Sequence, residues 1–218
     1  MVVSDRIESA PGSSKRSSRK RLAILDAATE VFLRDGYLGT SMDEIATLSS
    51  VSKQTVYKHF SSKEALFVEI VSSLTDRTGD AVHAEMPPMQ EAGDVATYLE
   101  AYGYRQLSIV LTPRIMQLRR LVIGEVSRFP DLARVLYERG PQRAMGELAD
   151  LFSQLAADGL LAVKDPAMAA VHFNWLVMAQ ALNQAMLLGD DAIPTPAEQR
   201  RAVKEGLAVF LAAYGVKR

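Results

Sequence analysis

Cysteine is absent from this chain of 218 residues. The absence excludes disulfide bonds and cysteine-ligated metal sites, and it suits a reducing compartment. Histidine is nearly as scarce, with only His59, His83 and His172, so a histidine-rich metal site is not expected. We therefore expect neither a metal ion nor any other cofactor.

Long apolar runs are also missing, whereas a membrane-spanning helix needs about 20 apolar residues. The richest stretch, 169–188, is interrupted by polar side chains at His172, Asn174, Gln180, Asn183 and Gln184. The N-terminal segment carries charges but no apolar core of the kind that secretion signals have. These features predict a cytoplasmic protein with no membrane partner.

The common catalytic motifs do not occur in the sequence. It has no His-Glu-x-x-His zinc motif, no Gly-x-Ser-x-Gly nucleophile elbow, no phosphate-binding glycine loop and no dinucleotide fingerprint. An enzyme is the competing class of function, and these absences leave it without support. We expect a protein that is not an enzyme.

What the sequence does contain is helical periodicity throughout, with no segment that alternates with the period of a strand. The last two helices are marked most clearly, because Asp165 and Thr195 are N-caps followed by proline, and Thr195 with Glu198 forms a capping box. The pattern predicts an all-α fold with helices at 19–35, 42–48, 53–60, 62–78, 95–111, 113–127, 130–138, 141–158, 166–188 and 196–214.

The most specific segment is SMDEIATLSSVSKQTVYKHFSSK, residues 41–63. Ser41 with Glu44 predicts a capping box at the start of one short helix, whose inward face would be Ile45, Ala46 and Leu48. A turn at residues 49–50 follows, and the hydroxyl of residue 52 would cap a second helix about 12 Å long. That length fits the width of a DNA major groove.

The second short helix has two unlike faces. Val56 and Phe60 share one face, while Gln54 and Lys58 lie nearly opposite them. Glutamine can pair with adenine, lysine can donate to guanine, and the methyl group of Thr55 suits thymine. An ordinary solvated helix pair is the alternative, but the turn spacing, the caps and the cluster of aromatic and basic residues together favour a DNA-reading helix.

Residues 19–65 resemble the N-terminal DNA-binding domain of the TetR family of bacterial transcriptional regulators. The resemblance rests on the segments RLAILDAATEVFLRDGY, TSMDEIA, VSKQTVYKHF and SSKEAL. One departure is Ser50, which stands where the family usually has glycine in the turn. If this residue needs positive φ, serine costs about 1 kcal/mol there.

The resemblance implies which positions contact duplex DNA. Tyr57, His59 and Lys63 also look like phosphate-binding residues by their chemistry, with Lys63 in the first turn of a helix that Ser61 would cap together with Glu64. The implied contact positions are Thr40, Ser41, Met42, Lys53, Gln54, Thr55, Tyr57, Lys58, His59 and Lys63.

The chain is predicted to have three parts. Residues 1–18 would be a disordered basic tail, 19–65 the helix-turn-helix domain, and 66–218 a helical domain for effector binding and dimerisation. Five basic residues cluster before the first helix: Lys15, Arg16, Arg19, Lys20 and Arg21. The cluster could lie along DNA as an arm or could act as a solubilising tail, and the sequence leaves both open.

The last two helices are rich in small and apolar residues. In the TetR family the corresponding helices form a four-helix bundle with a second copy of the chain. The resemblance therefore implies a homodimer whose two recognition helices would engage a pseudo-palindromic operator.

Segment 114–141 resembles a C-terminal domain type called AefR-like, found in one TetR subgroup. The resemblance implies a pocket for a small-molecule effector, whose binding releases the protein, most often a repressor, from its operator. The alternatives are ordinary core packing for the apolar candidates, a ligand-independent regulator, and an activator. The candidate pocket residues are Tyr102, Tyr104, Met116, Arg119, Phe152, His172, Trp175 and Met178.

Overall fold

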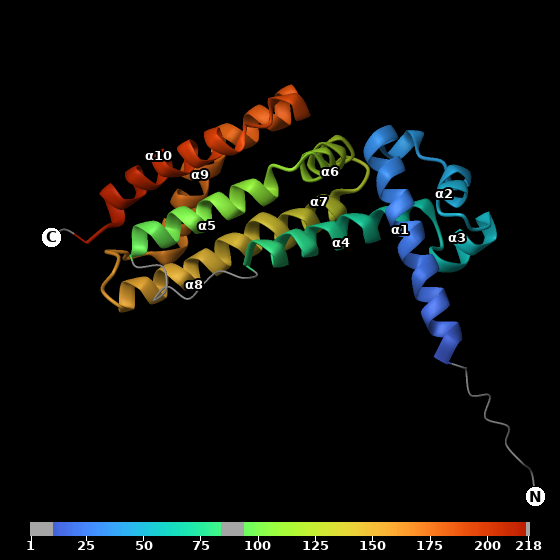
Figure 1. Ribbon diagram of the computed structural model, residues 1–218, viewed down its shortest axis with the longest axis horizontal. Helices are drawn as coiled ribbons and strands as arrows, with labels where there is room; N and C mark the ends of the chain where they lie inside the picture. The colour runs from blue at the N-terminus through green and yellow to red at the C-terminus, as the bar shows by residue number, and fades with distance from the viewer. Residues whose placement is uncertain (1–10, 84–93, 217–218) are drawn as a thin grey trace, which may run out of the picture. The chain divides into compact units, whose positions relative to one another are not determined.

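The computed structural model describes residues 11–83 and 94–216 (Figure 1). Its order is α1 (Pro11–Gly39), α2 (Met42–Leu48), α3 (Lys53–His59), α4 (Lys63–His83), α5 (Val95–Val110), α6 (Pro113–Gly124), α7 (Pro130–Tyr137), the π-helix η2 (Glu138–Gln142), α8 (Arg143–Ala157), α9 (Pro166–Leu188), the 3-10 helix η3 (Asp190–Ala192) and α10 (Pro196–Tyr214). Within these ranges the structure has no β-sheet, and its β-type pairing is an isolated antiparallel bridge between Leu161 and Gly215. The all-α prediction is confirmed.

The described chain divides into two compact units, an N-terminal unit that ends at Ile70 and a C-terminal unit that begins at Val71. Helix α4 contributes its first residues to the N-terminal unit and the remainder to the C-terminal unit.

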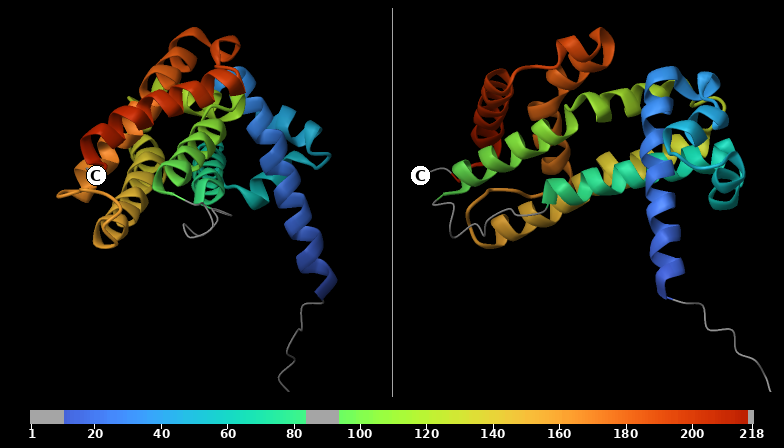
Figure 2. Two further views of the ribbon diagram at one scale, coloured as in Figure 1. Left: turned by 60° about the vertical axis from the view of Figure 1, so that its left-hand side comes forward. Right: turned by 45° about the vertical axis from the view of Figure 1, so that its right-hand side comes forward.

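The core of the N-terminal unit is built from one stripe of α1 and one of α4. Leu25, Ala28, Val31 and Phe32 are buried, as their spacing predicts. The ring of Phe32 stacks on that of Phe67, with ring centroids 5.1 Å apart. This core fixes α1 against α4, and Figure 2 shows α2 and α3 beside the C-terminal half of α1.

Helix α1 differs from the prediction at its start. It begins at Pro11 rather than Arg19, so residues 11–18 are helical and not disordered; residues 1–10 lie outside the described residues. At the other end the expected stop is confirmed, because Gly36 leaves helical geometry with φ 72°. Glycine adopts this backbone without the Cβ clash that other residues incur.

The core of the C-terminal unit is aromatic and lies among α5, α8, α9 and α10. The rings of Phe152 and Phe210 stack at 5.1 Å between centroids, and Phe173 meets both rings edge-on. Helices α9 and α10 approach closely at Gly206, where an added Cβ would lie 2.6 Å from the carbonyl oxygen of Leu176. The bounds of these two helices are those that their caps predict.

A second difference from the predicted helix boundaries lies around Pro141. The sequence predicts a break between helices at 138–141, but α7 continues through η2 into α8. Proline lacks an amide hydrogen, and the wider π-helical turn accommodates it without ending the helix. Helix α6 ends at Gly124, three residues before the predicted end.

Candidate DNA interface and effector pocket

The turn between α2 and α3 is a left-handed helix cap built on serine. Ser50 has φ 55° and is the single described residue other than glycine with positive φ. Its N–H donates to the Thr47 carbonyl at 3.1 Å, and the N–H of Val51 donates to the Ala46 carbonyl at 3.0 Å. This is the hydrogen-bond pair of a Schellman motif, so Ser50 occupies the position that glycine usually takes.

The start of α2 departs from the predicted capping box. Ser41 does cap the helix, but its hydroxyl accepts from the N–H of Asp43 at 3.3 Å. The Glu44 carboxylate instead accepts from the Arg34 guanidinium of α1 at 2.5 Å. A tertiary ion pair has thus replaced the local contact. Leu48, expected on the inward face, is 47% exposed.

Helix α3 packs on the rest of the N-terminal unit through one apolar face. Ser52 caps it by accepting from the N–H of Thr55 at 3.2 Å, and Val56 and Phe60 are buried. On the other side Gln54, Lys58 and Tyr57 are exposed, while Thr55 and His59 are half-buried. The two-faced character that the sequence predicts for this helix is confirmed.

Two of the candidate cations already have partners in the N-terminal unit. Lys53 forms an ion pair with Asp43 at 2.9 Å, and that carboxylate raises the pKa of the Lys53 ammonium. Lys63 donates to the carbonyl oxygens of Thr40 at 2.6 Å and Leu38 at 3.3 Å, and it lies over the ring of Tyr37. The Lys53 ion pair therefore holds α3 to α2, and the Lys63 hydrogen bonds hold the start of α4 to residues 38–40.

Two further candidates present little side-chain surface. Thr40 is 5% exposed and its hydroxyl donates to the Gly36 carbonyl, while Met42 is 8% exposed. At the start of α4 the predicted cap is wrong by one residue, because Ser62, and not Ser61, accepts from the N–H of Ala65 at 3.1 Å.

The basic residues predicted to cluster before the first helix lie in two different environments. Arg16 and Arg19 are exposed on the first half of α1. Arg21 forms an ion pair with Glu69 at 2.7 Å and lies over the ring of Phe60 at 5.2 Å from its centroid. Arg21 thus helps to hold α1, α3 and α4 together.

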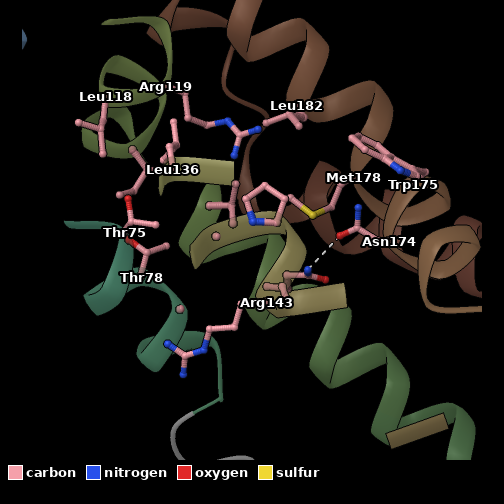
Figure 3. Close-up of a pocket in the computed structure, with 17 residues that line it drawn as sticks. Thr75, Thr78, Leu118, Arg119, Leu136, Arg143, Asn174, Trp175, Met178 and Leu182 are labelled. Carbon is pink, nitrogen blue, oxygen red and sulfur yellow. Dashed lines mark hydrogen bonds between the residues drawn. The ribbon is translucent and has the colours of Figure 1, made fainter. Parts of the chain in front are cut away.

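The C-terminal unit contains a pocket of about 80 Å³. This is enough for a small organic group, since one water molecule needs about 10 to 15 Å³ by this measure. Helices α4 to α9 all contribute to its wall (Figure 3). The lining residues are Thr75, Thr78, Gly79, Gln106, Val110, Ile115, Leu118, Arg119, Leu136, Gly140, Pro141, Arg143, Ala144, Asn174, Trp175, Met178 and Leu182.

Three of the eight sequence-predicted pocket residues, Arg119, Trp175 and Met178, line this pocket. The other five lie elsewhere in the C-terminal unit. Tyr102, Met116 and Phe152 are buried in its apolar core. The guanidinium of Arg200 lies over the ring of Tyr104, and Nδ1 of His172 is 2.6 Å from the Tyr214 hydroxyl. These side chains have structural partners away from the pocket.

The pocket wall also contains a polar pair, Gln106 and Asn174, that is not among the residues predicted from the sequence. Gln106 of α5 donates through Nε2 to Oδ1 of Asn174 in α9 at 3.1 Å, and both side chains are buried. The dashed line that ends on Asn174 in Figure 3 marks this bond. The sequence signal for this pair is one amide side chain on each of two otherwise apolar helix faces. Because the two residues are 68 positions apart, the sequence does not show that they meet.

Among the described residues, no group of three or more His, Cys, Asp or Glu side chains could hold a metal ion. None of the helices in residues 11–83 and 94–216 combines the length and the apolar character needed to cross a membrane.

Comparisons with known proteins agree with this geometry. Residues 24–70 match the bacterial regulatory proteins of the tetR family, and residues 97–216 match the C-terminal domain of AefR-like transcriptional repressors. An HTH-type transcriptional repressor of Mycobacterium tuberculosis is 30% identical over 190 residues, which are 87% of each chain.

Two solved structures are similar over nearly their whole length. A TetR-family transcriptional regulator from Mesorhizobium loti is 38% identical with a TM-score of 0.85, covering 92% of this chain and 99% of that one. The flavonoid-responsive regulator FrrA is 30% identical with a TM-score of 0.74, covering 92% of this chain and all of its own. The chain therefore belongs to the TetR family of bacterial transcriptional regulators and is a DNA-binding regulator with an AefR-like C-terminal domain.

Proposed function

We propose that this regulator is a cytoplasmic homodimeric repressor, without enzymatic activity, that binds a pseudo-palindromic operator and is released by a small molecule. The observation that carries the DNA part is the exposed polar face of α3. Gln54 and Lys58 project from a helix whose opposite face, Val56 and Phe60, is buried. Gln54 pairs with adenine, Lys58 donates to guanine, and the methyl group of Thr55 packs on thymine.

The remaining candidates would position the reading helix on the DNA backbone. Ser41, Tyr57 and His59 contact phosphates through their side chains, while Thr40 and Met42 act through their backbone groups. Lys53 and Lys63 keep their intramolecular partners and add positive charge beside the phosphates, which makes binding depend on salt concentration.

Exposed apolar side chains on the last two helices support the homodimer. Leu176, Leu187 and Leu188 of α9 and Val209 of α10 are between 40% and 80% exposed. Apolar groups gathered on two neighbouring helices are costly in water and suit burial against a second copy. A dimer would place two copies of α3 about 34 to 36 Å apart, one turn of DNA.

The pocket of the C-terminal unit is the proposed effector site. Helix α4 lines it with Thr75, Thr78 and Gly79, and the same helix begins with Lys63, which donates to the Thr40 carbonyl just before α2. A ligand that binds better to one position of α4 than to another would shift the population of DNA-binding conformers. The flavonoid response of FrrA and the repressor role of the Mycobacterium tuberculosis relative support this version of the function.

The central experiment is selection of bound fragments from random and genomic DNA with the purified full chain. We expect an enriched pseudo-palindrome, bound by a dimer. Lys58→Ala should weaken binding to the selected site, whereas Glu30→Ala, an exposed substitution on α1, is the matched control. A dimer that enriches no sequence would overturn the proposal, and so would a chain that is monomeric at micromolar concentration.

Two measurements separate the repressor from its alternatives. A promoter carrying the selected site should be silenced by the protein in a reporter assay; activation would favour the activator. Fluorescence of Trp175, the single tryptophan, should change when compounds bind the pocket beside it. Compounds that alter the fluorescence without releasing DNA would favour the ligand-independent regulator.

A further inference from the structure

The pocket wall is apolar except for a few groups, and their charges do not balance. No acidic side chain of the described residues lines it, while two arginines do. Arg143 has two counter-charges, at 3.0 Å in Asp80 and 2.8 Å in Glu147. Arg119 differs, because no carboxylate of residues 11–83 and 94–216 lies within ion-pair distance of it.

The guanidinium of Arg119 is also short of hydrogen bonds. Its Nε is shielded from solvent and has no acceptor within the described part of the chain. Desolvation lowers the pKa of this guanidinium, yet an arginine remains protonated in proteins. Figure 3 shows the side chain extending from α6 toward Leu182 of α9, above Met178. A positive charge is therefore held at the apolar wall with neither full hydration nor a counter-ion.

Leaving a cation in that condition is unfavourable, since partly buried charges are ordinarily paired. An apolar side chain of similar length would fit the same wall at lower cost. A bound oxyanion would supply both the missing charge and the missing acceptors, because a guanidinium matches a carboxylate in geometry.

A second orphaned group lies in the same wall. Gln106 uses its Nε2 on Asn174, but its Oε1 is buried and has no donor in the described ranges. It is an acceptor for one ligand hydroxyl or N–H. The remaining lining, including Leu118, Leu136, Met178 and Leu182, suits an apolar body.

We propose that the effector is an organic anion with an apolar body, whose acidic oxygen binds Arg119 and whose single hydrogen-bond donor binds Gln106. This rests on the proposed function, because it names the chemical class of ligand for the same pocket. Neutral apolar molecules and cations are disfavoured, since neither compensates the charge of Arg119.

Matched probe pairs test the class directly. Calorimetric titration of the full chain at neutral pH would compare benzoate with benzamide, 1-naphthoate with 1-naphthamide, and octanoate with octanamide. We expect at least one acid to bind about 10- to 100-fold more tightly than its own amide, the range of one charge-assisted hydrogen bond. Equal affinity within every pair, tighter binding of the amides, or no binding by any acid would overturn the inference.

Variants of Arg119 assign the preference to this side chain. Arg119→Met should bring the acid-to-amide affinity ratio close to one and leave the thermal midpoint unchanged or higher. Arg114→Met, at an exposed position of the same helix, is the matched control and should keep the ratio of the unaltered protein. If Arg119→Met does not fold, Arg119→Lys keeps the charge but not the planar fork, and it should reduce the ratio without abolishing it. A ratio that neither variant alters would show that Arg119 has a structural role.

The donor subsite has its own test. 6-Hydroxy-2-naphthoate, whose hydroxyl is too far from its carboxylate for an intramolecular hydrogen bond, should bind more tightly than 2-naphthoate to the unaltered protein but not to Gln106→Leu. The same gain in both proteins would overturn the role of Gln106. Fluorescence anisotropy measures, in parallel, the binding of the unaltered protein to the selected operator. If the unaltered protein does not bind this operator specifically, the proposed function is refuted. If it binds the operator but shows no preference for acids over amides, only the ligand class is refuted.

Discussion

The proposed DNA-reading helix and the proposed effector pocket both contain polar side chains, but in opposite surroundings. Gln54 and Lys58 are exposed on α3, so water satisfies their polar groups. Gln106, Asn174 and Arg119 line the pocket wall, where an unpaired group has little water to satisfy it. A change on α3 should therefore alter recognition with little effect on stability, whereas a change in the pocket should affect stability and ligand choice together.

The largest expected effect comes from breaking the core behind the reading helix. Phe32→Ala should lower the free energy of unfolding by about 3 to 5 kcal/mol, since the ring is fully buried and stacked on Phe67. Chemical denaturation measures the loss, and the half-exposed Leu22→Ala is the control. If calorimetry shows that the acid-to-amide preference survives while DNA binding is lost, the two units unfold separately.

The next effect should separate reading from stability. Gln54→Ala should cost about 1 to 3 kcal/mol of binding free energy at one base pair and leave the unfolding midpoint unchanged. Competition with operator variants measures the first quantity, and thermal melting the second. Uniform weakening on every operator would instead assign Gln54 to the DNA backbone.

The corresponding change in the pocket should affect the fold itself. Gln106→Leu should lower the free energy of unfolding by about 1 to 3 kcal/mol, because it leaves the Asn174 amide buried without its partner. Replacing both residues by leucine should restore most of the loss. Additive losses in this double-mutant cycle would show that the two amides do not depend on each other.

The smallest effect concerns the turn before α3. Ser50→Gly should raise the free energy of unfolding by up to about 1 kcal/mol, since the φ of 55° costs serine more than glycine. Ser50→Ala, which keeps the Cβ, serves as the comparison and should give no such gain. A stability change of the same size in both variants would point to the hydroxyl rather than the backbone.

Much of the fold could be predicted from the sequence because its signals are local. The proline that follows Thr195, with Glu198 two residues further on, specifies the start of α10, and the structure contains this capping box. The buried stripe of α1 follows from spacing alone. At the start of α2 the prediction was wrong because a distant group competed with a local one: Glu44 pairs with Arg34 of another helix instead of completing the cap of Ser41.

The candidate site divides in the same way. Helix α3 has only seven consecutive residues, so helical periodicity alone separates its buried and exposed sides. The pocket, in contrast, is lined by helices from α4 to α9. Phe152 packs in the core, whereas Trp175 lines the pocket. The packing of the helices decides between these two positions.

The sequence by itself determined the all-α fold, the caps at Ser52, Asp165 and Thr195, and the two faces of α3, because each depends on residues within a few positions of one another. The tertiary structure alone decided which lysines have intramolecular partners, and that Gln106 meets Asn174 in a pocket wall that also holds an arginine without a counter-ion. These outcomes depend on burial and on contacts between distant segments, and both become fixed only when the helices pack.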